Sequence, residues 1–522
     1  MSTPPIDVDE AEVDHLDPDA PAAPISVPDN GETSEGGKLK MIVQLLKRSL
    51  GVKDLAAMRL SLPASLLEPI PNLEYWMYLD RADLFAAIND SEDPFERMLA
   101  VIRFTFTKDL KFIRGKVCKP YNSVLGEHFR SHWDIIPVDY PSDPLQPPIQ
   151  YLYITPETAS TSSGSSKTNE TGSVLSFKSA KSKSSNSLPS SPKRPASIAA
   201  VEKNLAAGVS NLSLSGSQAS GSASGEGDAP ANAPRIRVAY ITEQVSHHPP
   251  ISTFHAACPD RGVTLTGVDQ ISARVSGTAV RVAPGSFNKG IFAKIESGNG
   301  AGEQYQITHP VANVNGILRG SFYVTVCEST VITCTGGKSG EKKLRAIIEY
   351  KDEPWLGKAQ FAIEGVIHTY SETSTEHEEW TKVKHVPRTC VVAQFDGSWR
   401  GRIRWKRADS PDVEYATLLD LAQLHVIPKN VRSIEKQLPT ESRKLWEGVT
   451  TKLLNKEFGD ATKVKQAIEQ RQRDLAAERK RRGEEFIPAY FEKDIDSGIP
   501  VLTEAGRKAL EEELNSEAPG CP

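Results

Sequence analysis

The chain has 522 residues, which is enough for two or more average domains or for one large domain with additional segments. Its 62 Lys and Arg residues against 67 Asp and Glu residues give a net charge of −5, so a general nucleic-acid-binding surface is disfavoured and any basic site must be local. The 6 cysteines include no CxxC pair, and no stretch of about 18 apolar residues occurs, which argues against a disulfide framework, a zinc finger and a membrane-spanning helix.

The N-terminal region changes character at residue 38. Residues 1–37 are rich in Pro, Asp, Glu, Ser and Gly and lack both the apolar content of a core and the basic start of a signal peptide, which predicts a disordered acidic tail. Residues 38–51 show apolar side chains at helical spacing, which predicts a short amphipathic helix ended by Gly51. This helix could bury its apolar stripe against the domain, or serve as a mobile lid that touches a membrane. The stripe consists of Leu39, Ile42, Val43, Leu46 and Leu50.

Residues 52–115 are predicted to form helices that precede a sheet. Asp93 and Pro94, followed by apolar residues at helical spacing, are typical of a helix N-terminus. A polar turn follows, in which Lys119 could grip an anion and Asn122 could donate amide hydrogens. A turn that only leads into a strand would explain the same two residues without any ligand.

A long insertion interrupts the predicted sheet. Residues 150–155 alternate as a strand does, whereas residues 156–234 consist largely of Ser, Gly, Thr, Ala and Lys. We predict that this segment is a disordered insertion between two neighbouring strands. A fold tolerates such an insertion because the entropic cost of closing a loop grows only slowly with its length.

The most distinctive stretch is the octapeptide Glu243-Gln244-Val245-Ser246-His247-His248-Pro249-Pro250, which follows an alternating strand pattern over 236–242. Its two prolines would end the strand and hold His248 in an extended conformation. Adjacent side chains on an extended backbone point to opposite faces, so a metal shared by His247 and His248 is disfavoured and an anionic ligand is favoured. A core histidine beside a surface histidine is the alternative without a ligand.

Short runs of β-forming residues then follow one another with turn residues between them and no helix. This pattern predicts an antiparallel meander long enough to close into a barrel over residues 116–407. A barrel of more than about ten strands has an interior wide enough for a ligand. The predicted strands after the octapeptide cover residues 263–268, 271–275, 278–282, 305–308, 317–326, 330–334, 344–350, 361–368, 391–395 and 401–405.

Residues 408–494 are predicted to form a helical C-terminal part. A strongly charged helix over 462–482 carries Lys465, Glu469 and Arg473 at positions i, i+4 and i+8, which places all three along one face. Ion pairs on a solvated helix would explain that spacing equally well.

Three separated segments resemble, in order, the signatures of the oxysterol-binding protein family of lipid-transfer proteins. The octapeptide matches the family's signature letter for letter. The segment around Lys119 and Asn122 resembles a second signature, with Ser123 where relatives commonly carry a proline. The spacing of the charged triplet in the 462–482 helix matches the helix that follows the family's barrel.

The resemblance covers residues 39–494 and implies an α+β, β-dominated fold. This fold would be a large antiparallel, near-closed β-barrel around a lipid tunnel, with an N-terminal lid, N-terminal helices and a C-terminal helical subdomain. The lipid-binding domain would extend over residues 38–494 with the insertion inside it, and residues 495–522 would form a C-terminal tail.

The resemblance also implies a site for a phosphoinositide headgroup at the barrel mouth. The basic side chains would neutralise the phosphates, the asparagine would donate hydrogen bonds, and the glutamate would accept inositol hydroxyls. Phosphate stabilises a protonated histidine, so affinity should fall at alkaline pH. The implied set is Lys119, Asn122, His247, His248, Lys465, Glu469 and Arg473.

The function implied is that of a cytoplasmic lipid-transfer protein that binds a sterol and phosphatidylinositol 4-phosphate in one tunnel and exchanges them between membranes. It would be monomeric, associate peripherally with anionic organelle membranes, and need no cofactor, metal or catalytic residue. Phosphatidylserine could replace the sterol, as the proline-punctuated segment 62–69 suggests, and a lipid-sensing scaffold is a further alternative. A hydrolase is disfavoured because the sequence has no GxSxG elbow and no HExxH helix.

Overall fold

The structure of the protein is a computed structural model. It describes residues 64, 67–114, 118–143, 145–152, 233–277, 279–316, 323–338, 342–354, 359–409 and 414–516, and the two-residue strands β1 (Ile25–Ser26), β2 (Leu60–Ser61) and β5 (Gly227–Asp228). The chain divides into two units, residues 152–219 and the rest, and the fold given below is that of the larger unit.

Three predicted segments lie outside the described residues. They are the acidic tail apart from β1, the amphipathic helix over 38–51, and nearly all of the insertion over 156–234. The five apolar residues of the helix, Leu39, Ile42, Val43, Leu46 and Leu50, therefore stay a prediction.

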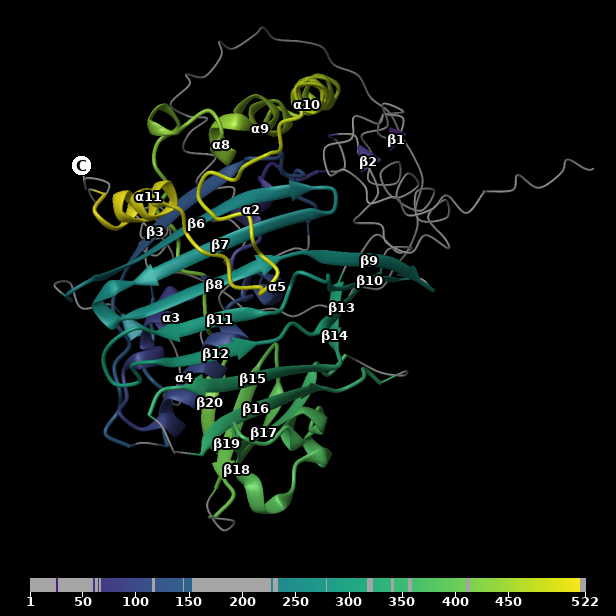
Figure 1. Ribbon diagram of the computed structural model, residues 1–522. Helices are drawn as coiled ribbons and strands as arrows, with labels where there is room; N and C mark the ends of the chain where they lie inside the picture. Colours follow the sequence, from purple (N-terminus) through teal and green to yellow (C-terminus); the bar gives the residue numbers. More distant parts are fainter. Residues whose placement is uncertain are drawn as a thin grey trace, which may run out of the picture. The chain divides into compact units, whose positions relative to one another are not determined.

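One large antiparallel sheet dominates the described part of the chain (Figure 1). It contains 12 strands in the order β20-β19-β18-β17-β16-β15-β12-β11-β8-β7-β6-β3, which confirms the predicted β-dominated, antiparallel fold. Its strands are β3 (His128–Ile135), β6 (Ile236–His247), β7 (Pro250–Cys258), β8 (Val263–Asp269), β11 (Ile291–Ile295), β12 (Glu303–Ile307), β15 (Ser329–Gly336), β16 (Lys343–Tyr350), β17 (Ala362–Tyr370), β18 (Val391–Ser398), β19 (Arg402–Arg407) and β20 (Ala416–Asp420).

Alternation of burial along the strands explains why these segments form a sheet. In β8, Val263 and Leu265 are buried while Thr264 and Thr266 are partly exposed, which is the period-two pattern of a sheet with one covered face. In β15, Ile332 lies at the centre of the same alternation. The branched side chains on the covered face supply most of the apolar burial that holds this sheet together.

A second sheet departs from the predicted single meander. Four strands pair in the order β14-β13-β10-β9 and do not join the main sheet, so the chain leaves the main sheet after β8 and again after β12. The first departure begins at Gln270, whose carbonyl accepts a hydrogen bond from Gly285 N at 2.8 Å and whose side-chain oxygen accepts one from Phe287 N at 2.9 Å. The strands are β9 (Ile271–Ser276), β10 (Ala279–Pro284), β13 (Val311–Asn315) and β14 (Tyr323–Cys327).

Short helices precede the sheet, as predicted. Helix α4 (Pro94–Thr107) begins where the sequence indicates, because Asp93 caps it by accepting a hydrogen bond from Phe95 N at 2.9 Å. Most of α4 is buried, and it contacts both β16 and β20. The other N-terminal helices are α2 (Asn72–Tyr75), α3 (Ala82–Ala86), η2 (Ala87–Asn89) and α5 (Lys111–Arg114), and β4 (Tyr151–Leu152) follows β3.

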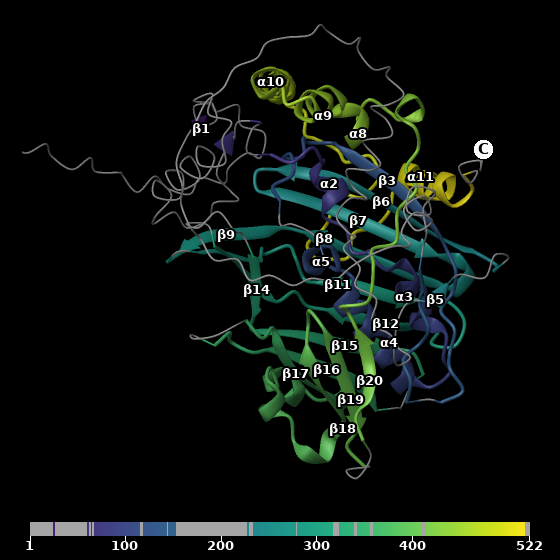
Figure 2. The same cartoon turned by 180° about the vertical axis from the view of Figure 1, so that it is seen from behind.

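Three helices follow the sheet in sequence and lie along one end of this unit (Figures 1 and 2). They are α8 (Ser442–Leu445), α9 (Glu447–Leu454) and α10 (Phe458–Arg482). Helix α9 packs against α10, and α8 contacts β3. Within the described residues, no helix is both long enough and apolar enough to cross a membrane.

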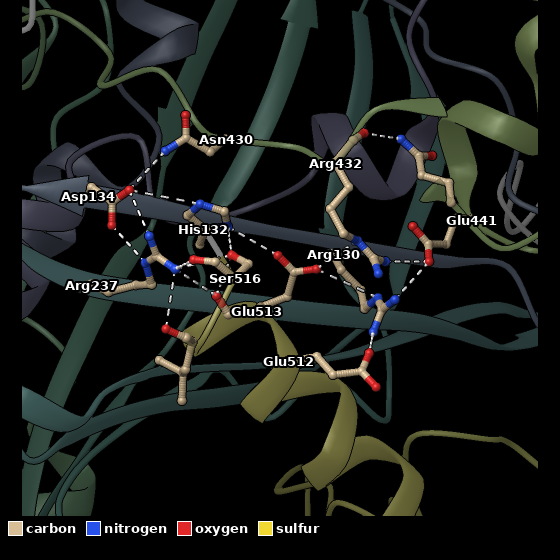
Figure 3. A network of polar contacts seen from close by, with 12 residues as sticks. Arg130, His132, Asp134, Arg237, Asn430, Arg432, Glu441, Glu512, Glu513 and Ser516 are labelled. Carbon is tan, nitrogen blue, oxygen red and sulfur yellow. Dashed lines mark hydrogen bonds and ion pairs between the residues drawn. The ribbon is translucent and has the colours of Figure 1, made fainter. Parts of the chain in front are cut away.

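The segment after residue 495 contains a last helix, α11 (Glu504–Leu514), which packs on β3 and β6. Figure 3 shows the ion pairs that hold α11 in place. Arg130 Nη1 lies 2.9 Å from Glu512 Oε2, and Arg130 Nη2 lies 3.1 Å from Glu441 Oε1. Arg432 Nε lies 3.1 Å from Glu513 Oε1. Helix α11, which we predicted to lie in a C-terminal tail over 495–522, is thus packed on the sheet.

A histidine, an arginine and an apolar cluster make the other contacts around α11. His132 Nδ1 lies 3.2 Å from Glu513 Oε2. Arg237 donates from Nε to Asp134 Oδ1 at 2.7 Å and from Nη1 to the carbonyl of Leu514 at 3.3 Å (Figure 3). An apolar cluster completes the contact, and its members are Ile241, Tyr490, Phe491, Leu502, Ala509 and Leu510.

Candidate functional site

The loop before β3 presents Lys119 and Asn122 on a firmly anchored backbone. Lys119 Nζ donates to Asn122 Oδ1 at 2.5 Å and to the carbonyl of Pro120 at 3.1 Å. Between them, Tyr121 is fully buried, packs against Trp446 with ring centroids 5.0 Å apart and an interplanar angle of 33°, and shares a 3.0 Å hydrogen bond with Thr450. The buried tyrosine therefore fixes this loop.

Glu127 anchors the other end of the same loop. Its buried carboxylate accepts hydrogen bonds from Val124 N at 3.0 Å, Ser442 Oγ at 2.6 Å and Trp446 Nε1 at 3.0 Å. Burial raises the pKa of Glu127 to about 7 in spite of these donors. The loop is thereby tied to α8 and to the start of α9.

Helix α10 brings a second lysine to this loop. Lys465 is 4% exposed, and its Nζ lies 2.5 Å from Glu469 Oε1, one turn further along the helix. The loss of hydration around the Lys119 ammonium, together with the positive charge of Lys465, lowers the pKa of Lys119 to about 8. Lys465, which is paired with Glu469, is therefore near enough to Lys119 for its positive charge to act on it.

Arg473 lies two turns after Lys465 on the partly buried side of α10. Its Nη2 and Nε donate to Gln470 Oε1 at 2.7 and 3.2 Å. Apolar packing holds the first half of α10 against the loop, since Phe458, Val464 and Ile468 pack against the cluster that contains Tyr121 and Val124, whereas the bonds of Arg473 stay within the helix.

The two histidines lie at a hairpin, where the sequence predicted a strand end. Strand β6 continues through the octapeptide to His247, the chain turns at His248 and Pro249, and β7 begins at Pro250, which pairs with His247. The His248–Pro249 peptide bond is cis. Both histidines are partly buried.

The geometry of this hairpin corrects one prediction from the sequence. We expected the two imidazoles on opposite faces, but their ring centroids lie 4.5 Å apart with an interplanar angle of 64°. The expectation was wrong because the period-two rule applies to a continuous strand, and His248 belongs to the turn. Among the described residues, no group of three or more His, Cys, Asp and Glu side chains could hold a metal ion.

Backbone pairing connects the lysine loop to the hairpin. Gly126 N donates to the carbonyl of Gln244 at 2.9 Å, and Gln244 N donates to the carbonyl of Glu127 at 2.9 Å. The contact requires glycine, because Gly126 has φ +75° and a Cβ there would lie 3.3 Å from the ring of Phe486. Arg479, near the end of α10, lies 5.9 Å from the same ring. The three predicted segments therefore adjoin one another through residues 124–127 and Phe486.

Glu243 has a role that the sequence did not reveal. It is fully buried and accepts hydrogen bonds from the backbone nitrogens of Ala489 and Tyr490 at 2.8 and 2.7 Å. His128 Nε2 lies 3.3 Å from the same carboxylate. The acidic start of the octapeptide thus anchors the C-terminal segment, and only its match to the octapeptide distinguished it in the sequence.

A second polar cluster, also missed, lies between the N-terminal helices and β8. Tyr78 donates a 2.6 Å hydrogen bond to Asp269, whose pKa is raised to about 7 by burial. The ring of His309 lies 5.5 Å from that of Tyr78, and burial together with the positive charge of Lys108 lowers the pKa of His309 to about 3. At neutral pH, this cluster therefore favours a neutral His309 and an Asp269 that is only partly ionised.

The fold is shared with solved proteins. The Osh1 ORD domain, solved in complex with cholesterol, has a TM-score of 0.54 and 17% identity and covers 94% of this chain and 91% of that chain. The family model described as oxysterol-binding protein matches residues 41–155 and 231–509. The chain therefore belongs to the oxysterol-binding protein family.

Individual relatives agree with this membership. The oxysterol-binding protein-like protein 1 of Schizosaccharomyces pombe is 40% identical over 514 residues, which cover 94% of this chain and 95% of the relative. The human oxysterol-binding protein-related protein 11 is 26% identical over 443 residues. The match covers 84% of this chain but only 46% of that protein, so the human relative is about twice as long.

Proposed function

We propose that the protein is a lipid-transfer protein that binds phosphatidylinositol 4-phosphate and a sterol in one cavity and exchanges them between membranes. The observation that carries the proposal is the meeting of Lys119 and Lys465 beside a single carboxylate in a member of the oxysterol-binding protein family. Two ammonium groups held together at a cost in hydration are stabilised when an anion lies between them.

The charges of the ligand match those of the site. An inositol phosphomonoester carries about −1.5 to −2 charge near neutral pH. Lys119, Lys465 and Arg473 supply three positive charges, and Glu469 supplies one negative charge that can also accept inositol hydroxyls. On phosphate binding, Lys119 Nζ would exchange its hydrogen bond to Asn122 for one to the ligand, which frees the asparagine side chain to bind the headgroup as well.

His247 and His248 complete the proposed headgroup shell. Their rings contact each other at the β6–β7 hairpin, so a phosphate bound there would lie against both. Protonation of an imidazole beside a phosphate is favoured by the charge of the phosphate, and this adds affinity at neutral and acidic pH.

The sterol part of the proposal rests on apolar burial. Burial of a sterol removes apolar surface from water at a gain of about 25 cal/mol per Å², without any charged partner. Solved relatives of the same fold, the Osh1 ORD domain with cholesterol and with ergosterol, support a sterol as the second lipid. Two lipids that exclude each other from one cavity make an exchanger, and no covalent bond is broken.

Lipid analysis and transfer assays test the proposal. Lipids that copurify with the full chain are identified by mass spectrometry, and transfer between vesicles is measured with labelled sterol, labelled phosphatidylserine and labelled phosphatidylinositol 4-phosphate. We expect phosphoinositide and sterol to be transferred and Lys119→Ala to abolish only the phosphoinositide part. Transfer of phosphatidylserine in place of sterol would show that phosphatidylserine is the second lipid. Stable lipid occupancy without transfer would indicate a lipid-sensing scaffold.

A matched pair of α10 variants provides the control. Lys465→Ala removes the buried lysine, and Lys463→Ala removes an exposed lysine of the same helix that is paired with Asp460 at 3.0 Å. If both variants bind phosphoinositide as the wild-type protein does, the headgroup assignment is wrong. We further expect the protein to associate peripherally with organelle membranes from the cytoplasm.

A further inference from the structure

The second sheet is joined to the main sheet along one line. Each of its strands continues a strand of the main sheet, because β9 follows β8, β10 leads into β11, β13 follows β12, and β14 leads into β15. The main sheet places these partner strands in the order β15-β12-β11-β8, and the second sheet has the matching order β14-β13-β10-β9 (Figure 1). The four connections therefore lie side by side, and they are residues 270, 285–290, 308–310 and 328.

Two residues fasten the ends of this line. At one end, the backbone and side-chain oxygens of Gln270 accept hydrogen bonds from two nitrogens of the 285–290 connection, at 2.8 and 2.9 Å. At the other end, Glu328 pairs with Arg281 of β10, and its carbonyl accepts a 3.0 Å hydrogen bond from Tyr350 N. Glu328 has φ +68°, which is uncommon for a residue with a side chain. Single residues at strand ends, held in such a conformation, are places where a hinge can absorb rotation.

The two faces of the second sheet differ in polarity. Residues that pair directly across strands lie on the same face. Arg274, Arg281, Asn313 and Thr325 pair in this way and mark a polar face. The other face is entirely apolar, and all of its side chains are at least partly exposed. The members of this apolar face are Ile271, Ala273, Val275, Val280, Val282, Pro284, Ala312, Val314, Val324 and Val326.

The line of connections adjoins the proposed headgroup site. Phe287, in the 285–290 connection, and Val245, in the octapeptide, pack against the same buried cluster. Val245 precedes His247 by two residues, so a lipid held by its headgroup at the β6–β7 hairpin has its hydrocarbon part close to the second sheet. Hydrocarbon is the partner that suits a face without charges, because each Å² of apolar surface removed from water contributes about 25 cal/mol.

From this geometry, we propose that the second sheet is a flap, which turns as one unit about the four connections and closes its apolar face on the hydrocarbon part of the bound lipid. The lipid contact rests on the proposed function, whereas the hinge does not. Strands with few buried side chains open at a lower cost in free energy than core strands do. A flap of this kind would let one cavity close on two lipids of different shape.

Amide hydrogen exchange of the lipid-free full chain, followed by mass spectrometry, tests the hinge. We expect the amides of β9, β10, β13 and β14 to exchange together and roughly 10-fold or more faster than those of β8, β11, β12 and β15. Gln270→Ala removes a side-chain hydrogen bond at the hinge and should speed exchange in the flap by about 2- to 10-fold.

A second buried glutamine provides the control for this variant. Gln437 is 8% exposed, against 9% for Gln270, and its Nε2 donates to the carbonyl of Arg432 at 2.7 Å. Gln437→Ala therefore removes a comparable hydrogen bond away from the flap, and it should leave exchange in β9, β10, β13 and β14 as in the wild-type protein.

A pair of double variants tests the lipid contact. Val280→Thr/Val282→Thr places two hydroxyls on the apolar face, and Ala279→Thr/Ala283→Thr places two on the polar face of the same strand. Affinity for a fluorescent sterol is measured by titration of the full chain. We expect the first variant to bind about 10-fold more weakly, because its hydroxyls lose water without gaining a partner, and the second to bind as the wild-type protein does. The same sterol should slow exchange in the wild-type flap.

The possible results separate the hinge from the lipid contact. Exchange in the second sheet as slow as in the main sheet would overturn the hinge. Fast exchange that the sterol leaves unchanged, together with equal affinities of the two double variants, would overturn the lipid contact. A wild-type protein that binds neither sterol nor phosphoinositide would reject the proposed function, while exchange in the lipid-free chain would still decide on the hinge.

Discussion

Two clusters of charged side chains in this molecule have opposite balances of charge. Around α11, Arg130 and Arg432 face three glutamates of the same chain, so every guanidinium of this cluster has carboxylates beside it (Figure 3). Beside α10, Lys465 lies close enough to Lys119 to lower the pKa of Lys119, and Glu469 pairs with Lys465. In the first cluster, carboxylates lie beside both guanidinium groups, whereas in the second the positive charge of one lysine acts on another, and this is why we propose the second as the anion site.

The largest expected effect tests the α11 cluster. Arg130→Ala would remove a buried guanidinium that lies within 3.8 Å of three glutamates, and would leave Arg432 as the remaining guanidinium beside the buried Glu441 and Glu513. We expect the free energy of unfolding to fall by about 3–5 kcal/mol, as for other broken buried ion pairs. Chemical denaturation measures this change. Glu512→Ala, which removes a half-exposed partner of the same arginine, should cost less than about 1 kcal/mol, and equal losses would contradict the comparison.

The next largest effect tests the α10 cluster, where we expect a loss of lipid affinity without a loss of stability. Lys465→Ala should weaken phosphatidylinositol 4-phosphate binding by about 10- to 100-fold, the loss of one charged hydrogen bond. Its thermal stability should stay close to that of the wild-type protein, because the repulsion on Lys119 disappears with the lysine. Calorimetry and thermal unfolding together check this. A variant that melts early while it keeps its affinity would show that Lys465 is structural.

A smaller effect concerns pH. The pKa of Lys119 is lowered to about 8 in the lipid-free protein, and a bound phosphate would raise it. The complex then holds more protons than the free protein above pH 8, so affinity should fall several-fold between pH 8 and about pH 9.5. Lys119→Arg keeps its charge over that range and should remove most of the decline. Titrations of both proteins with the short-chain lipid measure the difference, and parallel curves would exclude Lys119 as the group that titrates.

The smallest expected effect concerns a third cluster, at Tyr78 and Asp269. Burial raises the pKa of Asp269 from an ordinary value near 4 to about 7, so the folded state prefers the protonated carboxyl. Its contribution to stability is present below about pH 4 and is lost as the pH rises to 7. Asp269→Asn should therefore show a flatter decline in unfolding temperature over that range. Identical pH profiles of the two proteins would show that this carboxyl ionises freely in the fold.

Local signals predicted much of the fold. The Asp93-Pro94 pair marks a real helix N-terminus, because a cap and a proline depend only on neighbouring backbone. Alternation also identified most strands of the main sheet. It missed β7 (Pro250–Cys258), β11 (Ile291–Ile295), β13 (Val311–Asn315) and β20 (Ala416–Asp420), and it could not show that β13 pairs in a separate sheet, since pairing partners are distant in sequence.

Local patterns likewise predicted some features of the candidate site and missed others. The triplet on α10 follows from helical spacing, and Lys465 and Glu469 do meet. The contact between His247 and His248 could not be predicted, because it depends on a turn at Pro249 that the sequence pattern represents as the end of a strand. The anchoring role of Glu243 depends on backbone nitrogens about 245 residues away, which no local pattern encodes.

The pairing of β3 with β6 has a further consequence for how this domain can change. Eight consecutive pairs, from His128 with Glu243 to Ile135 with Ile236, set the register of the two strands, although the segments are about a hundred residues apart in the chain. Insertions and deletions between them can therefore accumulate without a shift in this register, which would move the octapeptide side chains to the other face of the sheet. The stretch between these strands is a place where evolution, or a protein engineer, can lengthen, shorten or label the protein while the octapeptide hairpin stays in place.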